Sequence, residues 1–489
     1  MLSIGKLAKG QESYYLSAVA QGAEDYYLGT GEAPGRWCGS ASGDLALTGE
    51  VVGDDLRAVL SGHDPMSGRK LARGNRTLPG FDCTFSAPKS VSIVHALGSE
   101  FERRVMSESH DAAVDAALGY LERQAAFGRR GRDGVHRVET SGFVAAAFRH
   151  RTSRAGDPQL HTHVLVANMV KASDGRWGAM DGRLVFAHKM DAGAVYQSHL
   201  RAEITDRLGF EWNTPRNGLA ELDGVPAKVL RAFSRRRTEI EAVLAVRGET
   251  SAAAAATATL ATRHAKRDID PDVLREEWAE RAAGLGFGAD EIAQIPGHRS
   301  GTTCATSREV LEELTRHQSF FDRRHVVRAL ATSSSTGMRV DELDERVDRV
   351  LSRDAVVGLV PDDLVGPRWT TQDLLDAEHR LLDRVARGRG RRIAVAAEHA
   401  VDAAIAARPS LSDEQRTMVA TITPSGAAVD VVVGAAGAGK TFALDAARDA
   451  WTASGHHVVG CALAARAAAQ LESGAGIPSF TVSAMQAFL

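Results

Sequence analysis

Two histidines stand two residues apart in an apolar run, and a third ends the apolar run before it. His161 and His163 fall in LHTHVLVAN, whose composition predicts a strand. Side chains at i and i+2 of a strand point to the same face, and a hairpin return can bring His150 beside them. Three neutral histidines form a metal site that keeps positions open for water or a substrate oxygen. The competing interpretation is that one histidine packs in the core and another caps a loop.

A carboxylate and two tyrosine doublets complete this set of reactive residues. Asp82 begins the strand-like segment FDCTFSAPKS. It is either a carboxylate satisfied within a turn or a partner that orients an imidazole or accepts a proton. Tyr14-Tyr15 and Tyr26-Tyr27 hold four of the six tyrosines in the chain. They are either aromatic core or nucleophiles, because a metal that polarises a phosphoryl oxygen lets a phenol attack phosphorus.

A further motif, GAAGAGKT, lies near the end of the chain and matches GxxxxGK[ST]. It follows the apolar segment AVDVVVG (428–434), which predicts a strand, and it precedes a helical pattern. Backbone N–H groups at such a helix start bind phosphates, the lysine reaches the β and γ oxygens, and the threonine ligates Mg²⁺. The glutamine of LSDEQ resembles the adenine-contacting glutamine of superfamily 1 helicases. The predicted nucleotide-binding residues are Gln415, Gly434, Gly437, Gly439, Lys440 and Thr441.

Apolar patterns predict the elements that must position the histidines and the aspartate. GFDCTFSAPKSVSIVHAL predicts a strand, a turn marked by proline and the start of a helix. HRVETSGFVAAAFRH and QLHTHVLVANMV predict two strands joined by a polar loop. GAVYQSHLRAEITDRLGF predicts a helix that ends at Gly209. Residues 1–245 therefore have an α+β pattern.

The rest of the chain is mainly helical in pattern. Residues 225–295 are rich in Ala, Arg and Glu, and helical patterns return over 308–405. The segment PGHRSGTTCATS (296–307) has little apolar content and is the predicted domain boundary. From residue 411 the order helix, strand, glycine-rich loop, helix, strand predicts the opening of a parallel α/β domain.

The bulk composition limits the class of protein. The 489 residues carry a formal net charge of −3, with 44% hydrophobic and 25% charged residues. This excludes wholesale disorder, a disulfide-stapled miniprotein and a uniformly basic surface, and suggests roughly two to four domains. Four dispersed cysteines and no signal-peptide core predict a cytoplasmic protein. No apolar run is long enough to predict a membrane span.

The reactive segments together resemble the conjugative relaxases of the TrwC/MobF type, in the HUH endonuclease superfamily. Thr162, between the two motif histidines, is a mild departure from the large apolar residue of the superfamily pattern. The resemblance covers roughly residues 1–295. Five segments carry it in the family's order: SYY, DYYLG, FDCTFSAPKSVS, FRHRTSRAGDPQLHTHVLVANMV and GAVYQSHLRAEITDRLGF.

The resemblance implies site- and strand-specific nicking and strand transfer at an origin of transfer. Tyr14 would attack the scissile phosphate and form a 5′-phosphotyrosine, and Tyr26 would perform the second transfer. Asp82 would orient the active-site histidine or accept the tyrosine proton. Tyr15 and Tyr27 would be the less favoured nucleophiles. The implied metal ligands are His150, His161 and His163.

Cofactors and partners follow from the same resemblance. The metal would be Mg²⁺ or Mn²⁺, with Zn²⁺ as an alternative, and ATP with Mg²⁺ would bind the phosphate loop. The substrate would be single-stranded DNA with a hairpin and a nic site. Relaxosome accessory proteins and a type IV coupling protein would be partners. Two basic clusters would contact phosphates or form solvated surface: Arg69, Lys70, Arg73 and Arg76, and Arg149, Arg151 and Arg154.

The predicted fold class is α+β, with three parts. Residues 1–295 would form a relaxase domain with a central antiparallel sheet flanked by helices. Residues 296–405 would form a helical linker or N-terminal helicase segment. Residues 406–489 would form a truncated RecA-like P-loop lobe, because the sequence stops without a Walker B acid. We expect such a chain not to unwind DNA by itself.

Two other functions remain open on the sequence alone. The first is a non-catalytic protein that only binds the origin, and the complete set of candidate residues argues against it. The second is a DNA-stimulated P-loop ATPase with an accessory N-terminal domain, and the missing Walker B acid argues against that. A rolling-circle replication initiator shares the chemistry of a relaxase but usually lacks this C-terminal arrangement.

Overall fold

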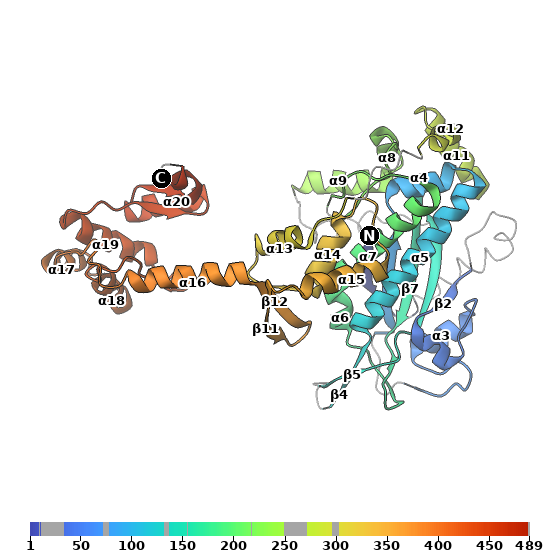
Figure 1. Cartoon of the computed structure of the whole chain (residues 1–489), viewed down its shortest axis with the longest axis horizontal. Helices are drawn as coiled ribbons and strands as arrows, with labels where there is room; N and C mark the ends of the chain where they lie inside the picture. Colours follow the sequence, from blue (N-terminus) through green and yellow to red (C-terminus); the bar gives the residue numbers. More distant parts are fainter. Residues whose placement is uncertain are drawn as a thin grey trace. The chain divides into compact units, whose positions relative to one another are not determined.

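The chain folds into two compact units, Met1–Gln372 and Asp373–Leu489. We describe each unit by itself. The computed structural model describes residues 1–8, 10, 34–71, 78–131, 136–153, 155–216, 218–248, 271–295 and 303–487 (Figure 1).

An antiparallel sheet of five strands forms the centre of the first unit, in the order β1-β3-β7-β6-β2. Its longest strands are β6 and β7, which form the hairpin predicted from the two apolar runs around the histidines. The strands are β1 (Leu2–Lys6), β2 (Arg36–Cys38), β3 (Gly80–Ser86), β6 (Ala145–Thr152) and β7 (Pro158–Ala167).

Helices pack on one face of this sheet and form the main core with it (Figure 1). They are α4 (Lys89–Leu97), α5 (Glu100–Ala125) and α7 (Lys189–Leu208). Phe85 and Val164 point from the strands into this core. The start of α5 is fixed by a capping box between Ser99 and Glu102. The predicted end of α7 is confirmed, because Gly209 takes up the left-handed conformation that ends a helix.

A smaller core covers part of the other face. The 3-10 helix η1 (Ser40–Leu45) and α3 (Gly53–Ser61) pack there with Trp37, Phe148 and Leu165. Phe148 and Leu165 lie two residues from His150 and His163 on their strands. Because side chains alternate, the histidines share this face and lie just beyond the small core.

The strands before and after the segment 9–33 lie at opposite edges of the sheet. β1 is the first strand of the sheet and β2 is the last. The predicted nucleophiles belong to the segment between them and lie outside the described residues: Tyr14, Tyr15, Tyr26 and Tyr27.

Helices from later in the chain hold the turn between β6 and β7. Buried Asp157 accepts hydrogen bonds from Arg235 at 2.8 Å and from Arg281 at 3.0 Å, and the Trp278 indole donates to the Gly156 carbonyl. The turn is therefore fixed by side chains of α9 and α11. The smaller elements of this region are β4 (Phe127–Arg130), β5 (His136–Glu139), β8 (Val170–Lys171), β9 (Trp177–Gly178), α6 (Gly182–Ala187), α8 (Ala227–Ala232), α9 (Arg235–Arg247), α11 (Pro271–Ala283) and α12 (Ala289–Ala293).

The last part of the first unit has the arrangement of a winged helix. Its strands form a separate antiparallel sheet in the order β10-β12-β11, and α14 and α15 form a helix-turn-helix. The elements are α13 (Ser307–Thr315), β10 (Phe321–Asp322), α14 (Arg323–Ser333), α15 (Val340–Leu351), β11 (Val356–Asp362) and β12 (Gly366–Thr371).

This winged helix packs on α7 through buried polar contacts. The fully buried guanidinium of Arg201 donates to the Ala331 carbonyl at 2.6 Å, and the Ser198 hydroxyl donates to the Met338 carbonyl at 3.1 Å. Residues 303–372 therefore belong to the same compact unit as the sheet. The sequence instead places a boundary at 296–307 and groups these residues with 373–405. The difference arises because packing on α7 is a long-range contact that no local pattern reveals.

The second unit has a core of small apolar side chains contributed by α17, α18 and α19. A parallel pair of short strands, β13 and β14, accompanies α20. The elements are α16 (Gln372–Arg387), α17 (Glu398–Ala406), α18 (Asp413–Ile422), α19 (Lys440–Ala453), β13 (Gly460–Ala462), α20 (Ala465–Ala475), β14 (Ser479–Thr481) and α21 (Val482–Gln486).

The strand predicted for residues 428–434 does not form. Val431 and Val433 in this stretch are 79% and 92% exposed. A parallel strand needs a neighbour on which to pair its backbone groups, and no strand in the described part of this unit pairs with 428–434. Among the described helices of both units, none is long and apolar enough to cross a membrane.

Candidate metal centre and phosphate loop

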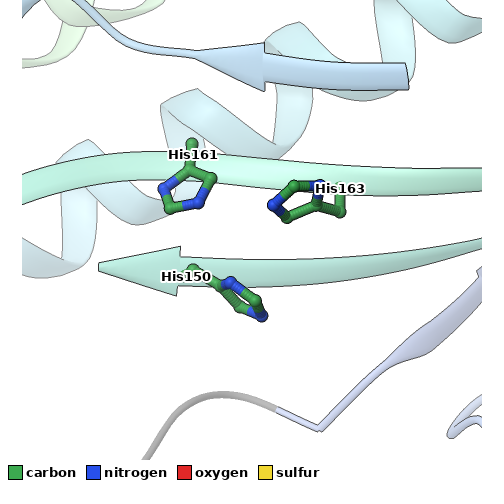
Figure 2. A group of neighbouring side chains, drawn as sticks. All are labelled: His150, His161 and His163. Carbon is green, nitrogen blue, oxygen red and sulfur yellow. The ribbon is translucent and has the colours of Figure 1, made fainter. Parts of the chain in front are cut away.

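Three imidazoles converge on the sheet face that carries the small core. His161 and His163 come from β7, and His150 comes from β6, directly opposite His161 (Figure 2). One nitrogen of each ring can be chosen so that the three atoms lie within 4.8 Å of one another. The ring centroids are 5.2 to 5.3 Å apart. A single metal ion can therefore take one nitrogen from each ring.

Hydrogen bonds at Nδ1 orient two of these rings. Nδ1 of His161 lies 2.8 Å from the carbonyl oxygen of Gln159. Nδ1 of His163 lies 2.9 and 3.0 Å from the two carboxylate oxygens of Asp82 on β3. An acceptor at Nδ1 fixes the tautomer that leaves the Nε2 lone pair for a metal.

Thr84 supports the aspartate and lies opposite His163 in the strand register. Its hydroxyl donates to a carboxylate oxygen of Asp82 at 3.0 Å and lies 3.1 Å from Nδ1 of His163. The sequence analysis did not identify Thr84. Its position two residues after Asp82 on one strand was the available signal, because both side chains then lie on one face.

The geometry of the cluster suits binding of an oxygen ligand. His150 is buried, whereas His161 and His163 are partly exposed, so the cluster lies at the surface of the sheet. Three histidines leave a metal with positions for phosphate oxygens or water. The structure thus brings His150, His161, His163 and Asp82 together.

Of the basic residues next to His150 in the sequence, Arg149 lies on the helix face of the sheet and not on the face of the imidazoles. Arg149 alternates with His150, points toward the helices and pairs with Asp111 of α5. Its guanidinium is therefore not beside the imidazoles, and it makes a structural ion pair instead of forming the predicted phosphate contact or solvated surface. Arg69 and Lys70 are exposed. Three other residues of these two basic clusters lie outside the described residues: Arg73, Arg76 and Arg154.

The glycine-rich motif of the second unit forms a loop that ends at the start of α19. Gly437 and Gly439 have positive φ values of 81° and 72°, and α19 begins at Lys440. The lysine ammonium donates to the carbonyls of Gly434 and Ala435 at 2.7 and 2.8 Å. These carbonyls hold the ammonium against the glycine-rich loop.

Gln415 contacts this loop from α18. Its amide nitrogen donates to the Ala438 carbonyl at 3.0 Å, and its amide oxygen accepts from the backbone N–H of Ser412. A side chain at position 439 would overlap the Gln415 amide. The close contact between Gln415 and the loop therefore requires glycine at this position. Thr441 follows Lys440 in the first turn of α19.

A family model for the TrwC relaxase matches residues 8–285 of the chain. The chain belongs to the TrwC relaxase family. A second model, for an AAA domain, matches residues 410–487, the part that holds the phosphate loop. The predicted fold class is therefore confirmed for both parts, and so is the resemblance seen in the sequence.

Relatives of this TrwC-type chain are conjugation proteins. The multifunctional conjugation protein TraI of Escherichia coli is 33% identical over 346 residues, which are 66% of this chain and 19% of TraI. The conjugal transfer protein TraA of Rhizobium radiobacter is 31% identical over 183 residues, 36% of this chain and 16% of TraA. The chain thus spans about a fifth of the length of these relatives.

Solved structures of the relaxase TrwC share the fold. A metal-bound complex of TrwC with OriT DNA matches with 32% sequence identity and a TM-score of 0.53. A complex with a 27-mer DNA comprising the recognition hairpin and the cleavage site matches with 31% identity and a TM-score of 0.52. Each match covers 59% of this chain and 99% of the TrwC chain.

Proposed function

We propose that the first unit is a metal-dependent DNA strand transferase that nicks one strand at an origin of transfer. The observation that carries the proposal is the cluster of His150, His161 and His163, with Asp82 behind one ring. Membership of the TrwC family and the likeness to TrwC bound to OriT DNA support the substrate class, single-stranded DNA with a hairpin and a nic site.

The histidines fit a divalent metal, because their nitrogens are close enough and two rings present Nε2. Such an ion would polarise the scissile phosphate and neutralise its charge. We assign Mg²⁺ or Mn²⁺, with Zn²⁺ as the alternative. Asp82 is proposed to orient His163, because its two oxygens accept from the imidazole and one of them also accepts from Thr84.

Tyr14 is the proposed first nucleophile. Its oxygen bonds to phosphorus as the bond to the 3′ oxygen breaks, so the 5′ phosphate stays on the enzyme, and the phenol proton ends on the departing 3′ oxygen, which leaves as a hydroxyl. The phosphodiester energy is kept in the phosphotyrosine, and religation needs no ATP. Tyr26 is the proposed nucleophile of the second transfer.

The wider assignments are proposals on the same basis. Residues 1–295 are the proposed relaxase domain and 406–489 the proposed P-loop lobe, and of the segment 296–405 between them residues 303–372 belong to the first compact unit. Relaxosome accessory proteins and a type IV coupling protein are the proposed partners, and the cytoplasm is the proposed compartment. The conjugation proteins to which the chain is related support these assignments.

The decisive experiment is capture of the covalent intermediate. The full chain is incubated with Mn²⁺ and single-stranded oligonucleotides that carry a hairpin followed by randomised bases. We expect an adduct that resists denaturation and that mass spectrometry maps to Tyr14. Tyr14→Phe should abolish the adduct but keep DNA binding. Wild-type binding without any adduct under Mg²⁺, Mn²⁺ or Zn²⁺ would instead support a protein that only binds the origin.

A second activity is proposed for the other unit: binding of ATP or ADP with Mg²⁺ at the phosphate loop. Lys440 held at the loop and Gln415 against it support this proposal, as does the AAA-domain match. Thr441 is the proposed Mg²⁺ ligand. We expect the described residues 406–487 to bind nucleotide without hydrolysing it, because neither of their strands, β13 and β14, carries an acidic residue.

A further inference from the structure

The residue between the two histidines of β7 faces away from the metal centre. Thr162 alternates with His161 and His163, so its side chain points to the helices on the opposite face of the sheet. It is 2% exposed there. A hydroxyl in such a position needs a hydrogen-bond partner, because burying an unpaired polar group is costly.

A buried histidine is that partner, and it is itself hydrogen-bonded to a tyrosine. The Thr162 hydroxyl lies 2.8 Å from Nε2 of His110 on α5. Nδ1 of His110 lies 2.8 Å from the hydroxyl of Tyr196 on α7. Burial lowers the pKa of His110 well below its usual value, so the ring is neutral, with one nitrogen as donor and the other as acceptor. Hydrogen bonds therefore connect these three side chains from β7 to α7.

These hydrogen bonds lie next to the irregular part of the pairing between β6 and β7. The pairing of β6 with β7 is regular up to His150 and His161, and the register then shifts before Thr152 pairs with Pro158. Any tilt of β7 at Thr162 would move both flanking imidazoles, because they share its backbone. A directional hydrogen bond resists such a tilt better than an apolar contact, which is non-directional.

We infer that Thr162 is a positioning residue for the metal centre. Through His110 and Tyr196 it holds β7 against α5 and α7, so that His161 and His163 present Nε2 to one ion. The inference rests on the proposed function, since it takes these two histidines as ligands. It gives the mild departure from the superfamily pattern at Thr162 a physical role.

The test compares Mn²⁺ affinity among variants of the full chain, measured by electron paramagnetic resonance titration. Thr162→Val removes the hydroxyl at nearly constant shape and should weaken Mn²⁺ binding about tenfold, the scale found for partners that orient metal ligands. Thr162→Ser keeps the hydroxyl and should bind Mn²⁺ as the wild type does. Tyr196→Phe removes the hydroxyl that bonds to His110. It should also weaken Mn²⁺ binding, but by less than Thr162→Val does.

Ser198→Ala is the matched control, because it also removes a buried hydroxyl that faces the other side of α7. It should lose thermal stability without losing Mn²⁺ affinity. The inference is overturned if Thr162→Val and Ser198→Ala lose stability alike while both bind Mn²⁺ normally.

A second measurement needs no metal. In the metal-free protein, Thr162→Val should shift the imidazole nuclear magnetic resonance signals of His161 and His163, and Ser198→Ala should not. Unchanged signals in Thr162→Val would reject the inference by themselves. A wild type that binds no Mn²⁺ but shows the shift would reject the proposed metal centre and keep the positioning role of Thr162.

Discussion

Two hydrogen bonds decide how the imidazoles of β7 face a metal ion. The Gln159 carbonyl and the Asp82 carboxylate each engage an Nδ1 atom, so both rings direct Nε2 outward. A backbone carbonyl does this without charge, whereas the aspartate also makes His163 a stronger electron donor. The two proposed ligands would therefore differ in strength although they lie on one strand.

Asp82→Asn tests this difference. The amide oxygen can still accept from His163, but the negative charge is lost, so we expect Mn²⁺ affinity to fall about tenfold. Isothermal titration calorimetry gives the dissociation constant. Asp181→Asn is a suitable control, because Asp181 is likewise a carboxylate held by a basic partner, Arg183, and not by a histidine. Equal Mn²⁺ affinity of Asp82→Asn and the wild type would exclude the role given to the carboxylate.

His95 should make stability depend on pH. Burial, with Arg149 and Arg151 nearby, lowers the pKa of His95 to about 3. Between about pH 6.5 and 3 the unfolded chain therefore binds a proton that the folded chain does not, and the free energy of unfolding decreases as the pH falls. The slope contributed by this group is about 1.4 kcal/mol per pH unit.

Urea denaturation at several pH values, monitored by circular dichroism, measures that slope. His95→Gln should flatten it, because glutamine does not titrate. His317→Gln, at an exposed position, should leave it unchanged. The assignment fails if His95→Gln retains the full dependence on pH.

At the scale of elements, α7 lies between the sheet and the winged helix. One side of it provides Tyr196, which reaches toward β7, and another provides Arg201 and Ser198, which bind carbonyls of the winged helix. Gly337 lies in the turn between α14 and α15, with φ of 79°. A methyl group there would overlap the carbonyl of Ser198. The turn therefore packs so closely on α7 that position 337 has no room for a side chain.

Gly337→Ala should destabilise the first unit by about 3 kcal/mol, through the unfavourable φ and the overlap with backbone. Gly366→Ala is a matched control, because Gly366 has φ of 82° but open space around it. It should cost only about 1 kcal/mol. Chemical denaturation of the two variants measures the difference. Equal costs would mean that the winged helix does not depend on its contact with α7.

At the scale of the whole molecule, each of the two units has its own core residues, which implies two unfolding units. The residues of the first unit share the sheet-based cores, whereas α17, α18 and α19 form their own. A ligand that binds one folded unit stabilises that unit alone unless the units are coupled.

Differential scanning calorimetry of the full chain should therefore show two transitions. MgADP at one hundred times its dissociation constant should stabilise only the transition of the second unit, by about 2.7 kcal/mol. Mn²⁺ should raise only the transition of the first unit. Lys440→Ala should abolish the response to MgADP and keep the response to Mn²⁺. A single transition that both ligands shift together would contradict the division into two units.

Local patterns in the sequence were enough to determine much of this protein. The strand period of two places His161 and His163 on one face, and the order of glycines and lysine defines the phosphate loop without any long-range contact. The strand–turn–helix around Asp82 and the end of α7 at Gly209 were predicted for the same reason.

Only the tertiary structure decided which of these local features meet. The strand register sets His150 opposite His161 and brings Asp82 and Thr84 to His163. Arg149, the winged helix and the missing strand at 428–434 differ from expectation because their environments depend on residues far away in the chain. Periodicity is a property of neighbours in sequence, whereas register, packing and strand pairing are properties of residues brought together by folding.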